Sequence, residues 1–273
     1  MRELRTCPVS GRTVLLNDDW LDRPAAVEAA PSPCPWCVHD GPHIAHLGPA
    51  HATPHRPPAL GVEGDPHPVV QAGAVRRQAV GAHEVVLAEH DAPDAALLPL
   101  IAARWHDLRR DTRLRGFSAV RRHVPGAHAA WQVFATPYEL PRSLPAGWRD
   151  AERADGQRVL HDGAAFTLLA WAPRAPFETW VMPGMGLEGL ERAGPEVLRA
   201  VGDAVAHALH TLRVALKDPP VDLVLVDGEP FRIELLPRLR PPTPVEVATG
   251  LPLHGVFPEA AAEYLTDRLR SAS

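Results

Sequence analysis

A Cys-x-x-Cys motif, Cys34-Pro35-Trp36-Cys37, is the clearest candidate for chemistry in the sequence. That spacing allows two thiolates to bind one tetrahedral zinc ion. A redox role would favour a helix N-terminus in a βαβ setting, and the surrounding stretch, rich in Pro, His and Gly, does not predict one. Two more ligands are needed, and the residue types alone leave open which histidines supply them: His39, His43, His46, His51, His55, His67, His83, His90 or His128.

The composition excludes several classes of function. The 28 Lys and Arg residues against 33 Asp and Glu give a formal net charge of -5, which argues against an unspecific nucleic-acid binder. No apolar run approaches the ~20 residues of a membrane span. The N-terminus lacks an apolar signal core and the chain holds only 3 cysteines, so we expect a cytoplasmic protein without a membrane partner. Lys217, the only lysine, precedes a predicted turn, which sets aside Schiff-base and P-loop mechanisms.

The hydrophobic pattern predicts the same order of elements twice. In the first half, a strand over 81–88 precedes a helix over 94–115 and strands over 117–120 and 129–136. The second half is predicted to hold strands over 165–172 and 179–182, a helix over 195–217 and a strand pair over 223–226 and 231–236. Residues 31–68 are predicted to be loop, and 141–162 a polar connector. The repeat predicts two α+β units joined at the connector.

Seven segments, in order, resemble the galactose-1-phosphate uridylyltransferases of the histidine-triad superfamily. Cys34-Pro35-Trp36-Cys37 is similar to the family's CPFC, and Phe177-Glu178-Thr179-Trp180 to its FETW. Gln132 begins the segment that is similar to the end of the family's HPHSQIFATP. The other segments are 7–15, 81–86, 233–238 and 250–270. The resemblance implies an α+β fold of two histidine-triad-like halves with antiparallel sheets and packed helices: an N-terminal zinc-bearing half, 1–150, and a C-terminal half, 151–273.

The resemblance also implies a ligand set for the metal. In that family one zinc is held by the two cysteines, by a later histidine and by the first histidine of HPH. Carried over position by position, the expected ligands are Cys34, Cys37, His90 and His128. All four residue types match those of a closed, structural zinc site.

The family's catalytic residue is missing. Its second HPH histidine attacks the α-phosphorus of a nucleotide sugar and carries the nucleotide covalently. The chain has Ala130 at that position, and a methyl group cannot attack phosphorus. The catalytic residues therefore stay unknown, with His128 and Gln132 as candidates. Because residues two apart on a strand share a face, His128 is an alternative nucleophile if it gives up the zinc; we favour the zinc role.

Other differences from the family's motifs concern the second metal site and the binding of a phosphorylated ligand. The family's second metal site uses a glutamate and an HWH pair; Glu178 remains, but the pair is replaced by Pro230-Phe231-Arg232, which predicts no second metal. Guanidinium groups suit phosphate recognition. We expect a phosphorylated ligand to bind through Arg23, Arg121, Arg122, Gln132 and Arg238.

Two functions follow from this pattern. The first is a diverged nucleotidyltransferase-family enzyme acting on a nucleotide, nucleotide sugar or sugar phosphate without the covalent histidine intermediate, for example in a specialised biosynthetic pathway. The alternative is a non-catalytic, zinc-stabilised binding protein on the same fold. The resemblance also implies a homodimer.

Overall fold

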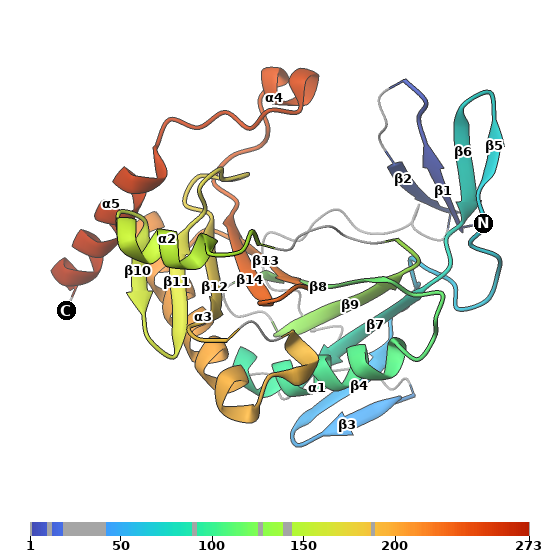
Figure 1. The fold of residues 1–273 in the computed structure, drawn as a ribbon, viewed down its shortest axis with the longest axis horizontal. Helices are drawn as coiled ribbons and strands as arrows, with labels where there is room; N and C mark the ends of the chain where they lie inside the picture. Colours follow the sequence, from blue (N-terminus) through green and yellow to red (C-terminus); the bar gives the residue numbers. More distant parts are fainter. Residues whose placement is uncertain are drawn as a thin grey trace.

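The structure is a computed structural model that describes residues 2–9, 13–18, 42–88, 92–124, 128–138, 144–186 and 189–272. Its strands form two antiparallel sheets, one of ten strands and one of four, and helices pack on the larger sheet (Figure 1). The predicted α+β class is confirmed. Among the described residues, no helix is both long enough and apolar enough to cross a bilayer.

The ten-stranded sheet runs through the whole body of the molecule. Its strand order is β10-β11-β12-β14-β13-β8-β9-β7-β4-β3. The strands are β3 Ala45–Leu47, β4 Ala50–Pro54, β7 Ala82–Leu87, β8 Gly116–His123, β9 Ala130–Thr136, β10 Val159–Asp162, β11 Ala165–Leu169, β12 Thr179–Pro183, β13 Val221–Val226 and β14 Arg232–Pro237.

The sheet repeats itself about its centre. One half runs β7, helix α1 (Asp94–Leu108), β8, β9, and the other runs β12, helix α3 (Pro195–Leu216), β13, β14. The two halves meet where β8 pairs with β13, with Val120 opposite Val224. Gln132 of β9 and Glu234 of β14 pair with these two valines and therefore occupy equivalent positions. The domain boundary at residue 150 stays a prediction.

Both long helices cover the same face of the sheet. Strand β9 alternates: Trp131, Val133 and Ala135 are buried, whereas Ala130, Gln132, Phe134 and Thr136 are half-buried. The buried set packs against apolar side chains of the two helices in one core; these include Leu97, Ile101 and Trp105 of α1 and Val201, Val205 and Leu209 of α3. Period-2 alternation on the strands thus defines a helix-covered face and an opposite face.

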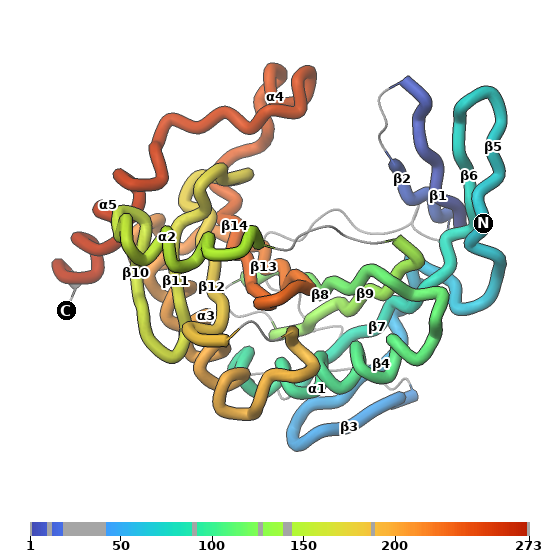
Figure 2. The backbone as a smooth tube through the Cα atoms, viewed as in Figure 1, coloured from blue at the N-terminus to red at the C-terminus, as the bar shows by residue number. Residues whose placement is uncertain are grey.

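The smaller sheet stands on the opposite face of the large sheet, over its N-terminal half (Figures 1 and 2). Its order is β2 (Thr13–Asn17), β1 (Arg2–Thr6), β6 (Ala74–Gln78) and β5 (Val69–Gln71). Leu4 and Phe134 pack on a small buried cluster of Ala59, Leu60 and Ala79 at its base. The remaining helices are α2 (Trp148–Asp155), α4 (Pro244–Thr249) and α5 (Pro258–Ala272), with a short 3₁₀ turn over Leu190–Arg192.

Two sequence-based expectations were wrong. Residues 31–68 were expected to be loop, yet β3 and β4 lie within them. The predicted connector 141–162 contains α2 and β10. These elements are short, and hydrophobic periodicity carries little information over so few residues. Sheet neighbours and side-chain packing, such as Trp148 of α2 against the Phe166, Leu168 and Met182 cluster, account for them instead.

Candidate functional site

The part of the opposite face nearest the centre of the sheet is less covered than its flanks. The base of the four-stranded sheet packs on one flank, over Phe134. On the other flank Leu144 and Trp148 cover Phe166, Leu168 and Met182. Between these two flanks, β9, β8 and β13 present side chains that are half-buried or exposed: Gln132, Val120, Arg122 and Val224. We call this strip the central strip.

Two guanidinium groups meet on one carboxylate at the end of the central strip. Arg122 donates from Nε to Asp222 Oδ1 at 2.6 Å and from Nη2 to Asp222 Oδ2 at 3.1 Å. Arg238 donates from Nε to Asp222 Oδ2 at 2.5 Å. Burial opposes ionisation of Asp222, but the hydrogen bonds from Arg122 and Arg238 outweigh it and lower its pKa. Two cations on one anion leave a surplus positive charge, and both arginines are partly exposed.

Arg121, also expected to bind the ligand, does not belong to this group. Neighbouring residues on a strand point to opposite faces, so Arg121 enters the helix-covered core while Arg122 faces outward. Its Nη1 donates to Asp94 Oδ1 at 2.7 Å, and its Nη2 donates to His123 Nδ1 at 2.9 Å. Trp131 Nε1 donates to the same Asp94 oxygen at 2.8 Å. Burial, with a smaller effect of the Arg121 charge, lowers the pKa of His123 to about 4.

Gln132 faces the central strip and contacts a histidine that was not singled out as a site residue. Its Oε1 lies 3.2 Å from Nε2 of His83 on β7. The His83 ring is stacked between His55, at 3.9 Å, and Phe134, at 4.1 Å between ring centroids. The pairing of β7 with β9 brings His83 beside Gln132 and Phe134. A sequence motif does not show this proximity, because the residues are far apart along the chain.

The nucleophile position and the zinc ligands are only partly described. Ala130 is half-buried at the start of β9. His128 Nε2 lies 2.7 Å from the carbonyl oxygen of Ala88, and a carbonyl can only accept, so Nε2 carries the proton. Cys34, Cys37, His90 and the expected ligand-binding Arg23 lie outside the described residues. Within the described ranges no cluster of three or more His, Cys, Asp or Glu side chains has a geometry that could hold a metal.

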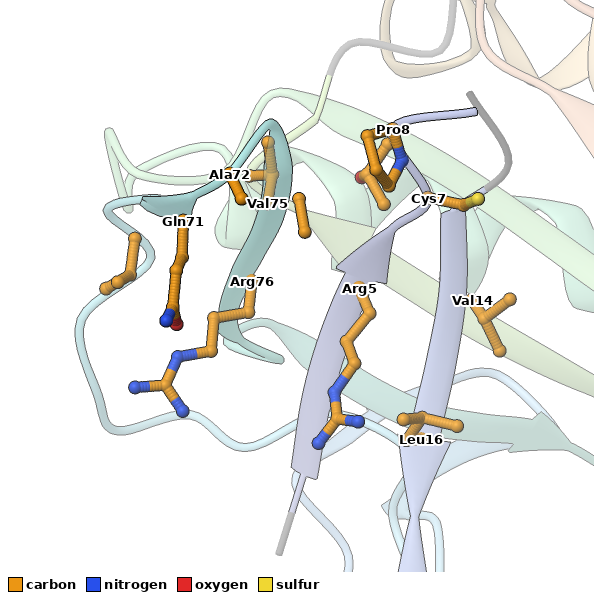
Figure 3. A pocket seen from close by; sticks show the side chains of 12 residues that line it. Arg5, Cys7, Pro8, Val14, Leu16, Gln71, Ala72, Val75 and Arg76 are labelled. Atoms are coloured by element: carbon orange, nitrogen blue, oxygen red, sulfur yellow. The ribbon is translucent and has the colours of Figure 1, made fainter. Parts of the chain in front are cut away.

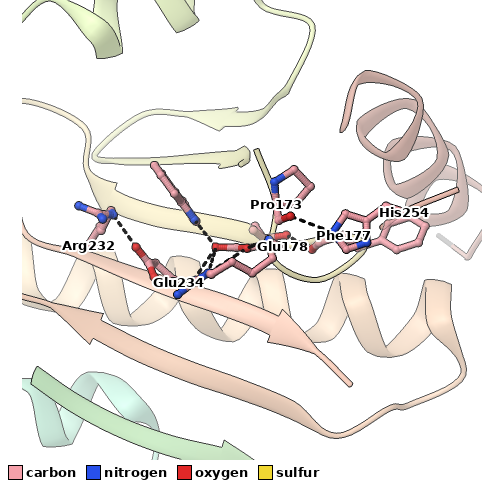
Figure 4. Close-up of polar contacts among 9 residues, drawn as sticks. Pro173, Phe177, Glu178, Arg232, Glu234 and His254 are labelled. Atoms are coloured by element: carbon pink, nitrogen blue, oxygen red, sulfur yellow. Dashed lines mark hydrogen bonds and ion pairs between the residues drawn. The ribbon is translucent and has the colours of Figure 1, made fainter. Parts of the chain in front are cut away.

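The equivalent position in the second half holds paired charges (Figure 4). Glu178 and Glu234 are almost fully buried. Arg174 Nη2 donates to Glu178 Oε1 and to Glu234 Oε2, at 2.6 Å each, and Arg232 Nε donates to Glu234 Oε1 at 2.8 Å. Trp180 Nε1 donates to Glu178 Oε1 at 2.9 Å. Two cations balance two anions here. The expectation of no second metal stays a prediction.

A groove of about 820 Å³ lies on the four-stranded sheet, away from these residues (Figure 3). Val14, Leu16 and Val69 line it and are all exposed. Arg5 and Arg76 are paired across β1 and β6 on the same face. The combination of apolar and basic side chains is suited to a partner surface rather than to catalysis.

Solved structures identify the fold over the full length of the chain. A uridylyltransferase structure aligns with a TM-score of 0.70, 16% identity and 99% coverage of both chains. The chain has a uridylyltransferase fold. An ADP-glucose phosphorylase from Arabidopsis thaliana with bound ADP-glucose aligns with a TM-score of 0.67, 17% identity and 98% coverage of both chains. A GalT-like protein from Arabidopsis thaliana aligns with a TM-score of 0.67 and 18% identity, covering 98% of this chain and 99% of that one.

The resemblance noted in the sequence is thereby confirmed at the level of the fold. Neither a protein-family model nor a curated protein matches the sequence. The uridylyltransferase fold therefore rests on three-dimensional similarity, and at these identities it leaves the reaction to be argued from the site.

Proposed function

We propose that the protein binds the diphosphate of a nucleotide sugar on the central strip and transfers its nucleotidyl group without a covalent histidine intermediate. The observation that carries the proposal is the Arg122–Asp222–Arg238 group, which presents surplus positive charge beside β9. Arg122 lies two residues beyond Val120, the partner of Gln132, so continuing that register places it level with Ala130. The ligand-binding set becomes Arg122, Arg238 and Gln132, with Arg23 as a further expected member.

The proposed reaction is a direct, in-line displacement. An oxygen of a phosphate or sugar phosphate attacks the α-phosphorus, the bond from that phosphorus to the bridging oxygen breaks, and the electron pair leaves on the departing sugar phosphate. Arg122 and Arg238 would stabilise the charge that develops on the phosphoryl oxygens. Ala130 supplies no nucleophile, and the Nε2–H group of His128 donates a hydrogen bond to the carbonyl oxygen of Ala88.

This proposal is tested by measuring the mass of the intact protein while the reaction products are followed. The intact protein is incubated with UDP-glucose or ADP-glucose and inorganic phosphate, and products are followed by phosphorus NMR. We expect turnover with the protein mass unchanged. A nucleotidyl adduct on the protein would refute the direct mechanism.

The alternative is a binding protein on the same fold. The missing nucleophile favours it, and the partly exposed arginines at the strip suit binding without turnover as well. Binding of a nucleotide sugar with no turnover for any phosphate acceptor would support this alternative over the enzyme.

A structural zinc held by Cys34, Cys37, His90 and His128 remains part of the proposal. The fit rests on His128: because Nε2 carries the proton, the lone pair of the neutral ring is on Nδ1, the atom that would bind the metal. Ala88, whose carbonyl oxygen accepts that hydrogen bond, is two residues before His90 in the sequence. The ion would supply folding free energy and no catalytic step.

Replacing one expected zinc ligand tests the metal site. Cys34→Ser is expected to lower the zinc content and the melting temperature together, because a structural site stabilises the fold. Cys7→Ser is the control, since Cys7 lies exposed on the small sheet. Zinc measured by mass spectrometry at the wild-type level in Cys34→Ser, with unchanged melting, would contradict the assignment.

We also propose a homodimer, in which the groove on the four-stranded sheet receives residues 241–257 of a second copy. This segment exposes Leu251, Leu253 and Phe257 and contains no Lys or Arg. The groove offers the exposed side chains of Val14, Leu16 and Val69, so each surface presents apolar area that the other would cover.

Oligomeric state measured by sedimentation equilibrium tests the dimer. Phe257→Asp and Val69→Asp are each expected to shift the protein to monomer, because each places a charge in the apolar contact. Val62→Asp, at an exposed valine outside the groove, is the control and is expected to remain dimeric. A monomeric wild-type protein at micromolar concentration would refute the dimer.

A further inference from the structure

We infer that His83 is a positioning residue, which fixes the Gln132 side chain so that its amide N–H groups face the phosphate oxygens. This inference rests on the proposed function and deepens it, because it specifies the chemistry that Gln132 presents on the strip: hydrogen-bond donors, suited to a diphosphate. His83 itself does not contact the ligand in this account. Its effect passes through one hydrogen bond.

The backbone sets the tautomer of His83. The N–H of Ala59 donates to His83 Nδ1 at 2.9 Å, and both groups are buried. A backbone N–H can only donate, so Nδ1 must hold the lone pair, and the neutral ring then carries its proton on Nε2. Protonating Nδ1 as well would break the bond to Ala59.

The tautomer in turn orients the amide of Gln132. Nε2–H of His83 faces the Gln132 side chain at 3.2 Å, and only the carbonyl oxygen of that amide accepts a hydrogen bond. The amide nitrogen therefore points away from His83. Among the residues that the structure describes, none accepts a hydrogen bond from it, which leaves both N–H groups for a ligand.

Stacking with two neighbouring rings restrains the orientation of the His83 ring. His55 and Phe134 lie on its two faces with interplanar angles of 12° and 21°. The His55 ring is itself held, since its Nδ1 lies 2.8 Å from the carbonyl oxygen of Pro57. His83 thus has little freedom to rotate, and the direction of its Nε2–H bond is set before any ligand arrives.

Without the Nε2–H donor, the Gln132 amide is free to turn its oxygen toward the phosphate. An oxygen facing an anion repels it, whereas an N–H bonds it. His83→Phe keeps a flat ring in the stack and removes the donor. His83→Gln removes the ring and keeps an N–H donor at a comparable distance from the backbone.

A double-mutant cycle tests the inference, with ADP-glucose and UDP-glucose as probes in calorimetric titrations. We expect His83→Phe to weaken binding about tenfold, the loss typical of one hydrogen bond to a charged group, and His83→Gln to restore part of that loss. In the Gln132→Ala background, His83→Phe should cause no further loss. An equal loss in both backgrounds would assign His83 a general structural role and overturn the inference.

Nitrogen-edited NMR on the free protein separates this inference from the proposed function. We expect the proton of His83 on Nε2 and a displaced Gln132 amide signal in His83→Phe. A proton on Nδ1 would overturn the positioning role even if nucleotide sugars bind. If the NMR result is as expected and neither probe binds the wild-type protein, the proposed function fails and the orientation of Gln132 stands.

Discussion

Asp94→Ala is expected to lower the free energy of unfolding by about 3–5 kcal/mol, the usual cost of removing one partner from a buried ion pair. Asp94 and Arg121 side chains are only 6% and 7% exposed, and Asp94 accepts hydrogen bonds from both Arg121 and Trp131. Without Asp94, the guanidinium group is left in the core beside His123. That ring has no negative charge to replace the carboxylate, and burial, which lowers its pKa to about 4, keeps it neutral near pH 7.

Urea unfolding monitored by tryptophan fluorescence measures this loss. Asp107→Ala is the control on the same helix, since Asp107 is 49% exposed and pairs with Arg104, which keeps its bond to Glu84. Exposed pairs contribute about 0–1 kcal/mol, so the control should stay close to wild type. Equal losses in the two variants would show that the buried pair is not a main source of stability.

The double variant Arg122→Ala/Arg238→Ala is expected to weaken binding of ADP-glucose and UDP-glucose by about 100-fold or more. Each hydrogen bond from a charged donor contributes roughly 1.5–3 kcal/mol, and these two guanidinium groups carry the positive charge of the strip. Asp222, no longer paired, would also repel the diphosphate.

Calorimetric titration measures the affinity, and circular dichroism establishes that the variant is folded. Arg199→Ala is the control: Arg199 is also exposed and paired with a carboxylate, but lies on α3, which covers the other face. Its affinity should equal that of wild type. A double variant that binds as tightly as wild type would place the ligand elsewhere.

The sequence predicted the long elements and the fold well, because these depend on extended patterns. The helix predicted over 195–217 is α3, and the strand pair around Asp227-Gly228-Glu229-Pro230 is β13 and β14. Short elements such as β3 and α2 were missed because packing rather than local pattern determines them.

The site was less predictable because it depends on register. Arg121 and Arg122 are neighbouring residues of the same type, so the sequence alone does not distinguish them. The alternation of side chains along β8 places Arg121 in the core and Arg122 on the exposed face. Asp222 was not predicted as a site residue, because only the pairing of β8 with β13 brings it beside Arg122. His83 and Gln132 are 49 residues apart, and their contact follows from the pairing of β7 with β9.

The proposed function depends on binding of the diphosphate of a nucleotide sugar at the central strip. It is tested by a calorimetric titration of the wild-type protein with ADP-glucose and UDP-glucose, with inorganic pyrophosphate as competitor. We expect saturable binding of one ligand per chain, displaced by pyrophosphate. Absence of binding for both nucleotide sugars and for pyrophosphate would contradict it.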